Sequence, residues 1–199
     1  VLEMPQNLIY ADKLRKEFLE RITKPQEVDQ LAKDISDNER NAGEYQGRVV
    51  LEMIQNMDDQ GNGKQITGLI KIEGSNLIVC NEGIPFSEDG IKSVHMSGLS
   101  SKDAEENIGN KGLGFRSLLN FSDKIQIFSG DFAVEFSEKT AQEEFEKVKN
   151  DPQVIKSINY RTKRHKETYI PMLLTPKNID YAPERKSNGK YNIDGHEYD

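Results

Sequence analysis

The sequence predicts an α+β fold in which helices cover one face of a mostly antiparallel, mixed sheet. Two pairs of short β-type runs read as hairpins. Residues 68–73 and 76–80 flank Gly74-Ser75, and residues 124–128 and 132–136 flank a Ser-Gly-Asp turn. Helical segments separate the hairpins, without the regular strand–helix–strand alternation of a parallel sheet. We therefore expect a two-layer sandwich of helices on this sheet.

The clearest helical periodicity lies between residues 44 and 60. Apolar residues recur there at i, i+3, i+4 and i+7, and Gly61-Asn-Gly63 ends the pattern. We expect this stripe to pack on the sheet. It consists of Val50, Met53, Ile54 and Met57.

Shorter elements complete the prediction. Residues 8–35 favour two helices broken near Pro25. Ser87 is suited to cap a helix that runs to about Met96, and residues 112–121 and 138–150 favour two more. A mobile loop is expected over residues 97–111 and a strand within residues 168–174.

Composition divides the chain into three segments. We expect a helical extension over residues 1–40, a main domain over 41–175 and a polar, poorly ordered segment over 176–199. The chain begins at Val1 and not at methionine, so we expect a fragment of a longer protein.

Composition also restricts the class of protein. The net charge of −7 argues against a general nucleic-acid coat. No apolar run approaches the roughly 20 residues that span a bilayer, and no signal peptide is evident. The single Cys80 cannot form an internal disulfide, and no Cys/His cluster has zinc spacing. These features favour a soluble, cytoplasmic protein with no membrane partner.

A first block of functional residue types lies in the 44–60 helix. Glu52, Asn56 and Asp59 occur at i, i+4 and i+7, on one stripe roughly opposite the apolar one. Asn56 could offer an amide oxygen to Mg²⁺, and Glu52, one turn earlier, could deprotonate an attacking water. Taken alone, the pattern more often describes a solvated helix face.

A second block, residues 81–86, follows the first hairpin. Asn81 or Glu82 could hydrogen-bond the amino group of an adenine, and the sequence leaves the choice between them open. Gly83 lies in the turn, which is also the ordinary structural reading. Ile84 and Phe86 could supply an apolar wall.

A third block, residues 108–116, opens a predicted helix with glycines. Glycine lets the backbone approach an anion closely, and the start of a helix favours negative charge. Gly109 and Lys111 extend this cradle, and Lys102 lies in a preceding loop with the composition of a lid. The backbone N–H groups available to phosphate belong to Gly112, Leu113, Gly114 and Phe115. Neither a P-loop nor a complete Rossmann fingerprint is present.

The three blocks together resemble the Bergerat-fold (GHKL) ATPases, and residues 51–130 are most similar to the sacsin-like branch. The resemblance implies ATP·Mg²⁺ bound between helices and sheet. In that family pattern Glu52 is the general base, Asn56 the Mg²⁺ ligand, Asp59 a lining residue and the third block the triphosphate site. Asn81 replaces the usual aspartate. The Gly-Thr pair of a final strand is missing, so we expect the fold to lack that strand.

The resemblance makes a Mg²⁺-dependent ATPase our main prediction, with ATP and ADP as ligands. Lid closure would then change the conformation of further domains of a longer chain or join two copies in an ATP-dependent homodimer. The alternatives are a nucleotide-gated binding module with little catalysis and a histidine-kinase-type phosphotransfer domain. The basic cluster Arg161–Lys166 is interpreted as a solvated loop, with nucleic acid or an acidic partner surface as the alternative.

Overall fold

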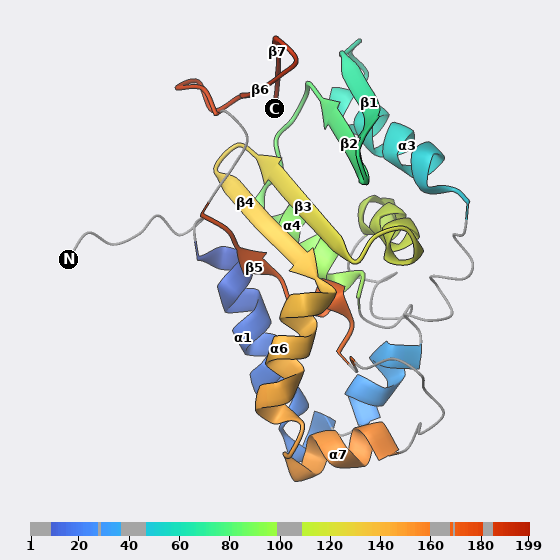
Figure 1. Cartoon of the computed structure of the whole chain (residues 1–199), viewed down its shortest axis with the longest axis vertical. Coiled ribbons are helices and arrows are strands. Elements are labelled where there is room, and N and C mark those ends of the chain that lie inside the picture. Colours follow the sequence, from blue (N-terminus) through green and yellow to red (C-terminus); the bar gives the residue numbers. More distant parts are fainter. Residues whose placement is uncertain are drawn as a thin grey trace, which may run out of the picture.

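Helices and short antiparallel strands make up the fold, which confirms the predicted α+β class (Figure 1). The computed structural model describes residues 9–27, 29–36, 47–98, 109–159, 168, 170–180 and 185–199; residues 109–113 and 159 are described by their backbone alone. Within this part of the chain, no helix is both long and apolar enough to cross a membrane.

The described strands form three small antiparallel sheets. The first pairs β1 (Gly68–Glu73) with β2 (Asn76–Asn81), and the last pairs β6 (Tyr191–Ile193) with β7 (His196–Tyr198). The middle sheet has the order β3 (Lys124–Ser129), β4 (Phe132–Ser137), β5 (Lys177–Asn178). Both predicted hairpins are therefore confirmed. The expected single sheet is not observed, because β2 and β3 do not pair with each other.

The N-terminal helices break where the sequence predicts. Helix α1 (Tyr10–Ile22) is followed by the 3₁₀ turn η2 (Pro25–Glu27), and residues 29–36 are again helical. Proline lacks the N–H that would continue the α1 hydrogen bonds. Helix α1 buries one face at helical spacing, through Ala11, Leu14, Phe18 and Ile22.

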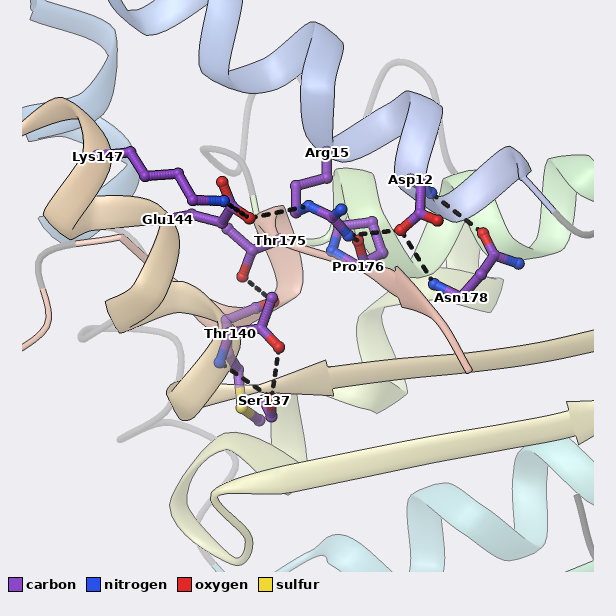
Figure 2. A network of polar contacts seen from close by, with 10 residues as sticks. Asp12, Arg15, Ser137, Thr140, Glu144, Lys147, Thr175, Pro176 and Asn178 are labelled. Carbon is purple, nitrogen blue, oxygen red and sulfur yellow. Dashed lines mark hydrogen bonds and ion pairs between the residues drawn. The ribbon is translucent and has the colours of Figure 1, made fainter. Parts of the chain in front are cut away.

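A polar network fixes α1 to the C-terminal half of the chain (Figure 2). Arg15 Nη1 donates to Asp12 Oδ1 at 2.7 Å and to the carbonyl oxygen of Pro176 at 2.6 Å. Arg15 Nε lies 3.4 Å from Oε1 of the largely buried Glu144. Asp12 and Asn178 exchange backbone-to-side-chain hydrogen bonds. Helix α1 is thereby joined to α6 (Glu138–Val148) and to β5.

The helices after the second hairpin differ partly from the prediction. Ser137 Oγ accepts from Thr140 N at 3.2 Å and caps α6, which ends before Pro152 as expected. Pro152 also begins a helix that the sequence analysis missed, α7 (Pro152–Asn159).

The strand predicted within residues 168–174 is wrong. Met172–Leu174 form the 3₁₀ turn η4, and all three side chains are buried. A short apolar run is compatible with a buried strand or a buried turn, and contact with β4 and with helix α4 (Glu88–Met96) favours the turn here.

The main core lies between the middle sheet and the helices. Ile125, Ile127, Val134 and Phe136 alternate along β3 and β4 and are buried. They share one apolar cluster with α1, η4 and α4 (Glu88–Met96). Ser87 caps α4 by accepting from Gly90 N at 3.2 Å, as predicted. By contrast, every residue of β1 and β2 is half-buried or exposed.

The C-terminal segment is more regular than its composition predicts. It supplies β5 and the β6–β7 hairpin, in which Tyr191 and Tyr198 pair in register and are buried. The expectation of poor order after residue 175 is therefore wrong for the described residues. Long-range contacts of these tyrosines stabilise a segment whose local sequence is polar.

Candidate functional site

Helix α3 (Val49–Gly61) carries the first block, and its buried face differs from the expected one. Val50 and Ile54 of the predicted apolar stripe are 48% and 45% exposed, whereas Met53 is buried. The Glu52 side chain is only 12% exposed. The Glu52 side chain and the amide nitrogen of Asn56 are therefore not part of a solvated helix face. Another segment of the chain, η3 (Gly109–Asn120), lies against them.

That segment is η3 (Gly109–Asn120), a run of 3₁₀ turns where the sequence predicts an α-helix from residue 112. Gly114 lies directly against α3. A Cβ atom added at Gly114 would come within 3.1 Å of Asn56 Nδ2 and 3.3 Å of Glu52 Oε2. The absence of a side chain at Gly114 therefore permits the contact between the first and third blocks.

The Asn56 amide is the most informative polar group of this contact. Its nitrogen is buried and has no hydrogen-bond partner among the described residues. A buried polar atom left unpaired costs about 1–3 kcal/mol. Because amide oxygen and nitrogen are assigned from their partners, the group can present either atom to a ligand. The amide is thus suited to bind something other than the described protein atoms.

A cavity of about 930 Å³ lies beside this contact, between α3, β2, the start of α4 and β3. Its size is that of a small-molecule site. All three blocks contribute to its walls. Their lining residues among the predicted site residues are Asn56, Asp59, Asn81, Phe86 and Phe115.

Aromatic packing joins the second and third blocks at the cavity wall. The Phe86 and Phe115 rings meet edge to face, with centroids 6.1 Å apart and an interplanar angle of 79°. Phe86 N also donates to Ser129 Oγ at 3.0 Å, which connects the second block to β3. Segments far apart in the sequence therefore meet at one wall.

Gly83 connects the second block to the end of α3. Its φ of +137° is a conformation that other residues rarely adopt, and a Cβ atom there would lie 2.6 Å from the Gln60 carbonyl oxygen. Ile84 N donates to the same oxygen at 3.2 Å. Gly83 thus has a structural reason to be glycine and is not among the cavity-lining residues.

The two candidates for an adenine contact point in different directions. Asn81 lines the cavity, whereas Glu82 does not. The Glu82 carboxylate accepts from Thr67 N at 3.0 Å and lies 2.9 Å from His196 Nε2. Two hydrogen bonds lower the pKa of Glu82. The larger effect comes from the Thr67 backbone N–H and the smaller one from His196. The Glu82 side chain is thus occupied outside the cavity.

The remaining predicted site residues lie outside the described part of the chain, are described by their backbone alone, or do not line the cavity. Lys102, most of the expected lid and the basic cluster at 161–166 lie outside the described residues. For Gly109, Lys111, Gly112 and Leu113 the backbone alone is described, as part of η3. Glu52 and Gly114 lie beside the cavity but do not line it.

Sequence reasoning missed one wall of the cavity. Tyr191, Ile193, Tyr198 and Asp199 line it from the β6–β7 hairpin. The signal was present, since Asp194-Gly195 separates two short alternating runs and both residues have positive φ angles. Asp-Gly between alternating residues is a strong hairpin signal.

Comparison with known proteins adds one partial similarity. The chain is 29% identical over 90 residues to the protein NO VEIN of Arabidopsis thaliana. The match covers 44% of this chain and 3% of the plant protein, so the chain spans a small part of that relative. No family model matches the chain, and no solved structure matches it.

Two further side chains have structural explanations. His95 is buried, and its Nδ1 donates to the carbonyl oxygen of Leu173 at 3.1 Å. Burial lowers the pKa of His95 to about 4. Burial likewise raises the pKa of the Cys80 thiol. In the described part of the chain, no three His, Cys, Asp or Glu residues form a group suited to hold a metal.

Proposed function

We propose that this chain contains a Bergerat-type nucleotide-binding unit that binds ATP with Mg²⁺ and hydrolyses it to ADP. The observation that supports the proposal best is the convergence of the three blocks on one cavity, at the contact of Gly114 with Glu52 and Asn56. In this proposal, residues 41–175 form the unit and the β6–β7 hairpin extends it.

Asn56 is the residue that would hold Mg²⁺. Its buried, unpartnered amide fits a role as an oxygen ligand, and Mg²⁺ commonly takes a few protein oxygens and completes its shell with water and phosphate. Bound there, the cation would neutralise charge on the phosphates. The acidic Asp59 lines the same cavity about one turn further along α3 and could contact the cation's waters.

Glu52 is the proposed general base. Its carboxylate would accept a proton from water as the water oxygen bonds to the γ-phosphorus and the bond to the ADP oxygen breaks. The η3 backbone from Gly109 to Phe115, together with Lys111, would contact the triphosphate. Lys102 would reach the nucleotide from the lid. Asn81 would face the adenine ring, and Gly83 would hold the turn that positions Asn81. Phe86 would form an apolar wall.

Turnover measurements test the roles of these residues. Glu52→Gln should lower phosphate release by about 10²–10⁴-fold while ATP still binds, because it removes the base and keeps the shape. Asn56→Ala should weaken the Mg²⁺-dependent part of ATP binding measured by calorimetry. Asp58→Asn is the matched control, since Asp58 is exposed on the same helix and does not line the cavity. Turnover of Glu52→Gln at the parent rate would reject the assignment of the base.

A nucleotide-gated binding module is the second candidate, and one contact favours it. Glu52 Oε1 lies 3.3 Å from Arg48 Nη2, so the proposed base is ion-paired, and it is not among the residues that line the cavity. This candidate predicts saturable ATP binding without phosphate release in the parent protein. The same assays therefore separate the two proposals.

A larger assembly is part of the proposal. Because the matched segment is a small part of a long relative, we propose that nucleotide-dependent closure acts on further domains or on a second copy of the chain. Sedimentation of the parent protein with and without a non-hydrolysable ATP analogue tests whether two copies of the chain associate when nucleotide is bound.

A further inference from the structure

The β6–β7 hairpin closes the end of the cavity at the second block. Asp199 N donates to the Asn81 carbonyl oxygen at 3.1 Å, and Tyr191 OH donates to the Gly130 carbonyl oxygen at 3.1 Å. The hairpin thus bridges the end of β2 and the β3–β4 turn. An isolated two-stranded hairpin is marginally stable, so these contacts must hold it in place.

Asp199 is the acidic group that this hairpin brings to the cavity. Its side chain is only 16% exposed and lines the cavity, whereas its ion-pair partner Lys190 does not line it. Gly83 N donates to Asp199 Oδ2 at 2.9 Å, and Lys190 Nζ lies 3.0 Å from Oδ1 and 3.1 Å from Oδ2. A carboxylate has about four acceptor positions, so capacity remains for a ligand donor.

The walls near Asp199 suit a flat, largely apolar ring. Tyr191, Tyr198 and Phe128 all line the cavity, and the centroids of the Phe128 and Tyr191 rings are 6.2 Å apart. Aromatic walls with a few directed polar groups are typical of sites for heterocycles. The polar group added by the hairpin, a carboxylate, can accept hydrogen bonds but cannot donate them.

We infer that Asp199 determines base specificity by accepting a hydrogen bond from the exocyclic 6-amino group of a purine. The inference rests on the proposed nucleotide site and deepens it. In the same pose a 6-oxopurine would place a carbonyl oxygen against the carboxylate with no proton between the two acceptors, and its N1–H would reach the carboxylate only if the ring shifted. The cavity should therefore select adenine nucleotides over 6-oxopurine nucleotides.

Calorimetry with Mg·ATP and Mg·ITP on the full chain tests the inference. ITP differs from ATP by having a 6-oxo group in place of the amino group. The parent should bind ATP about 10- to 100-fold more tightly than ITP, the range expected for a hydrogen bond to a charged group. Asp199→Asn should lose most of this preference, because its amide can also donate to a 6-oxo group.

Two controls separate recognition from docking of the hairpin. Glu197→Gln changes an exposed carboxylate of the same hairpin, which accepts from Asn188 Nδ2 at 3.1 Å, and should keep the preference for ATP. Lys190→Gln removes an anchor and keeps the Asp199 carboxylate, so it should also keep the preference. If Lys190→Gln loses as much of the preference as Asp199→Asn, hairpin docking explains the effect and the inference fails.

The outcomes also distinguish this inference from the proposed function. ATP binding by the parent with an unchanged preference in Asp199→Asn would overturn the role of Asp199 and leave the nucleotide site standing. Equal binding of ATP and ITP by the parent would also overturn the role of Asp199 and leave the nucleotide site standing. A parent that binds neither nucleotide would reject both.

Discussion

The two sides of the molecule differ in how they are held together. The core side (α1, α4, α6 and β3–β5) buries alternating apolar residues, and Val134 and Phe136 are completely buried. The cavity side (α3, β1, β2 and the β6–β7 hairpin) leaves Leu51 and Ile72 61% and 76% exposed. Fewer of its apolar side chains are buried, and backbone hydrogen bonds, ion pairs and close approaches at glycines supply many of its contacts.

The two sides therefore have different roles, one in stability and the other in adjustment to a ligand. Apolar burial stabilises the core side, which positions β3 and η3 as one wall of the cavity. Regions with few buried apolar contacts open at lower free energy, so the cavity side should adjust more readily to a ligand. The candidate site lies where the two sides meet.

The largest effect should come from the core side. Phe136→Ala should lower the free energy of unfolding by about 3–5 kcal/mol, because it empties a fully buried aromatic site. Ile72→Ala, on the cavity side, should change it by no more than about 0.5 kcal/mol. Urea denaturation of both variants measures the contrast. Equal losses would show that β1 contributes to the core as much as β4 does.

Acid should also weaken the core side, through His95. Its pKa of about 4 in the folded chain lies below its ordinary value of 6.5, because burial disfavours the charged ring. The unfolded chain therefore takes up a proton first, and the free energy of unfolding should fall by about 3 kcal/mol between pH 6.5 and pH 4.

His95→Gln tests this pH dependence, since glutamine can donate to the Leu173 carbonyl oxygen without titrating. Its free energy of unfolding should fall less than that of the parent in this window, and the two slopes should agree above pH 7. Identical slopes throughout would show that His95 is not buried and neutral.

Two glycines on the cavity side should differ in their tolerance of a side chain. Gly83→Ala should cost about 2–3 kcal/mol, because it combines an unfavourable φ with a clash at the Gln60 carbonyl oxygen. Gly74→Ala should cost about 1 kcal/mol, since its φ is also positive but nothing lies within 4 Å of the added Cβ. Thermal unfolding compares the pair, and equal costs would exclude the close approach at Gly83.

A small change in stability, with the clearest functional effect, is expected at Gly114. Gly114→Ala should alter the free energy of unfolding by less than about 1 kcal/mol, because the side-chain ends of Asn56 and Glu52 can move. Displacing them should weaken Mg·ATP binding about tenfold, equivalent to roughly 1.4 kcal/mol. Calorimetry alongside Asn120→Ala, an exposed position of the same segment, measures this effect. Unchanged affinity would separate Gly114 from the site.

Local sequence determined the elements whose stability depends on near neighbours. The alternation of residues 124–136, the Gly74-Ser75 turn and the capping residue Ser87 all predicted structure that is observed. The chemical types in the three blocks likewise identified Asn56, Asn81 and Phe115 as candidates before their positions were known, and all three line one cavity.

Tertiary contacts decided what local pattern could not. The buried face of α3 depends on η3, which is distant in sequence, so Glu52 and Asn56 are covered while Val50 is exposed. The run at Met172–Leu174 became a turn by packing on α4. The polar C-terminal hairpin became a cavity wall through bonds to Asn81 and Gly83. Periodicity reports which residues share a face, but the segment that covers that face is set by long-range packing.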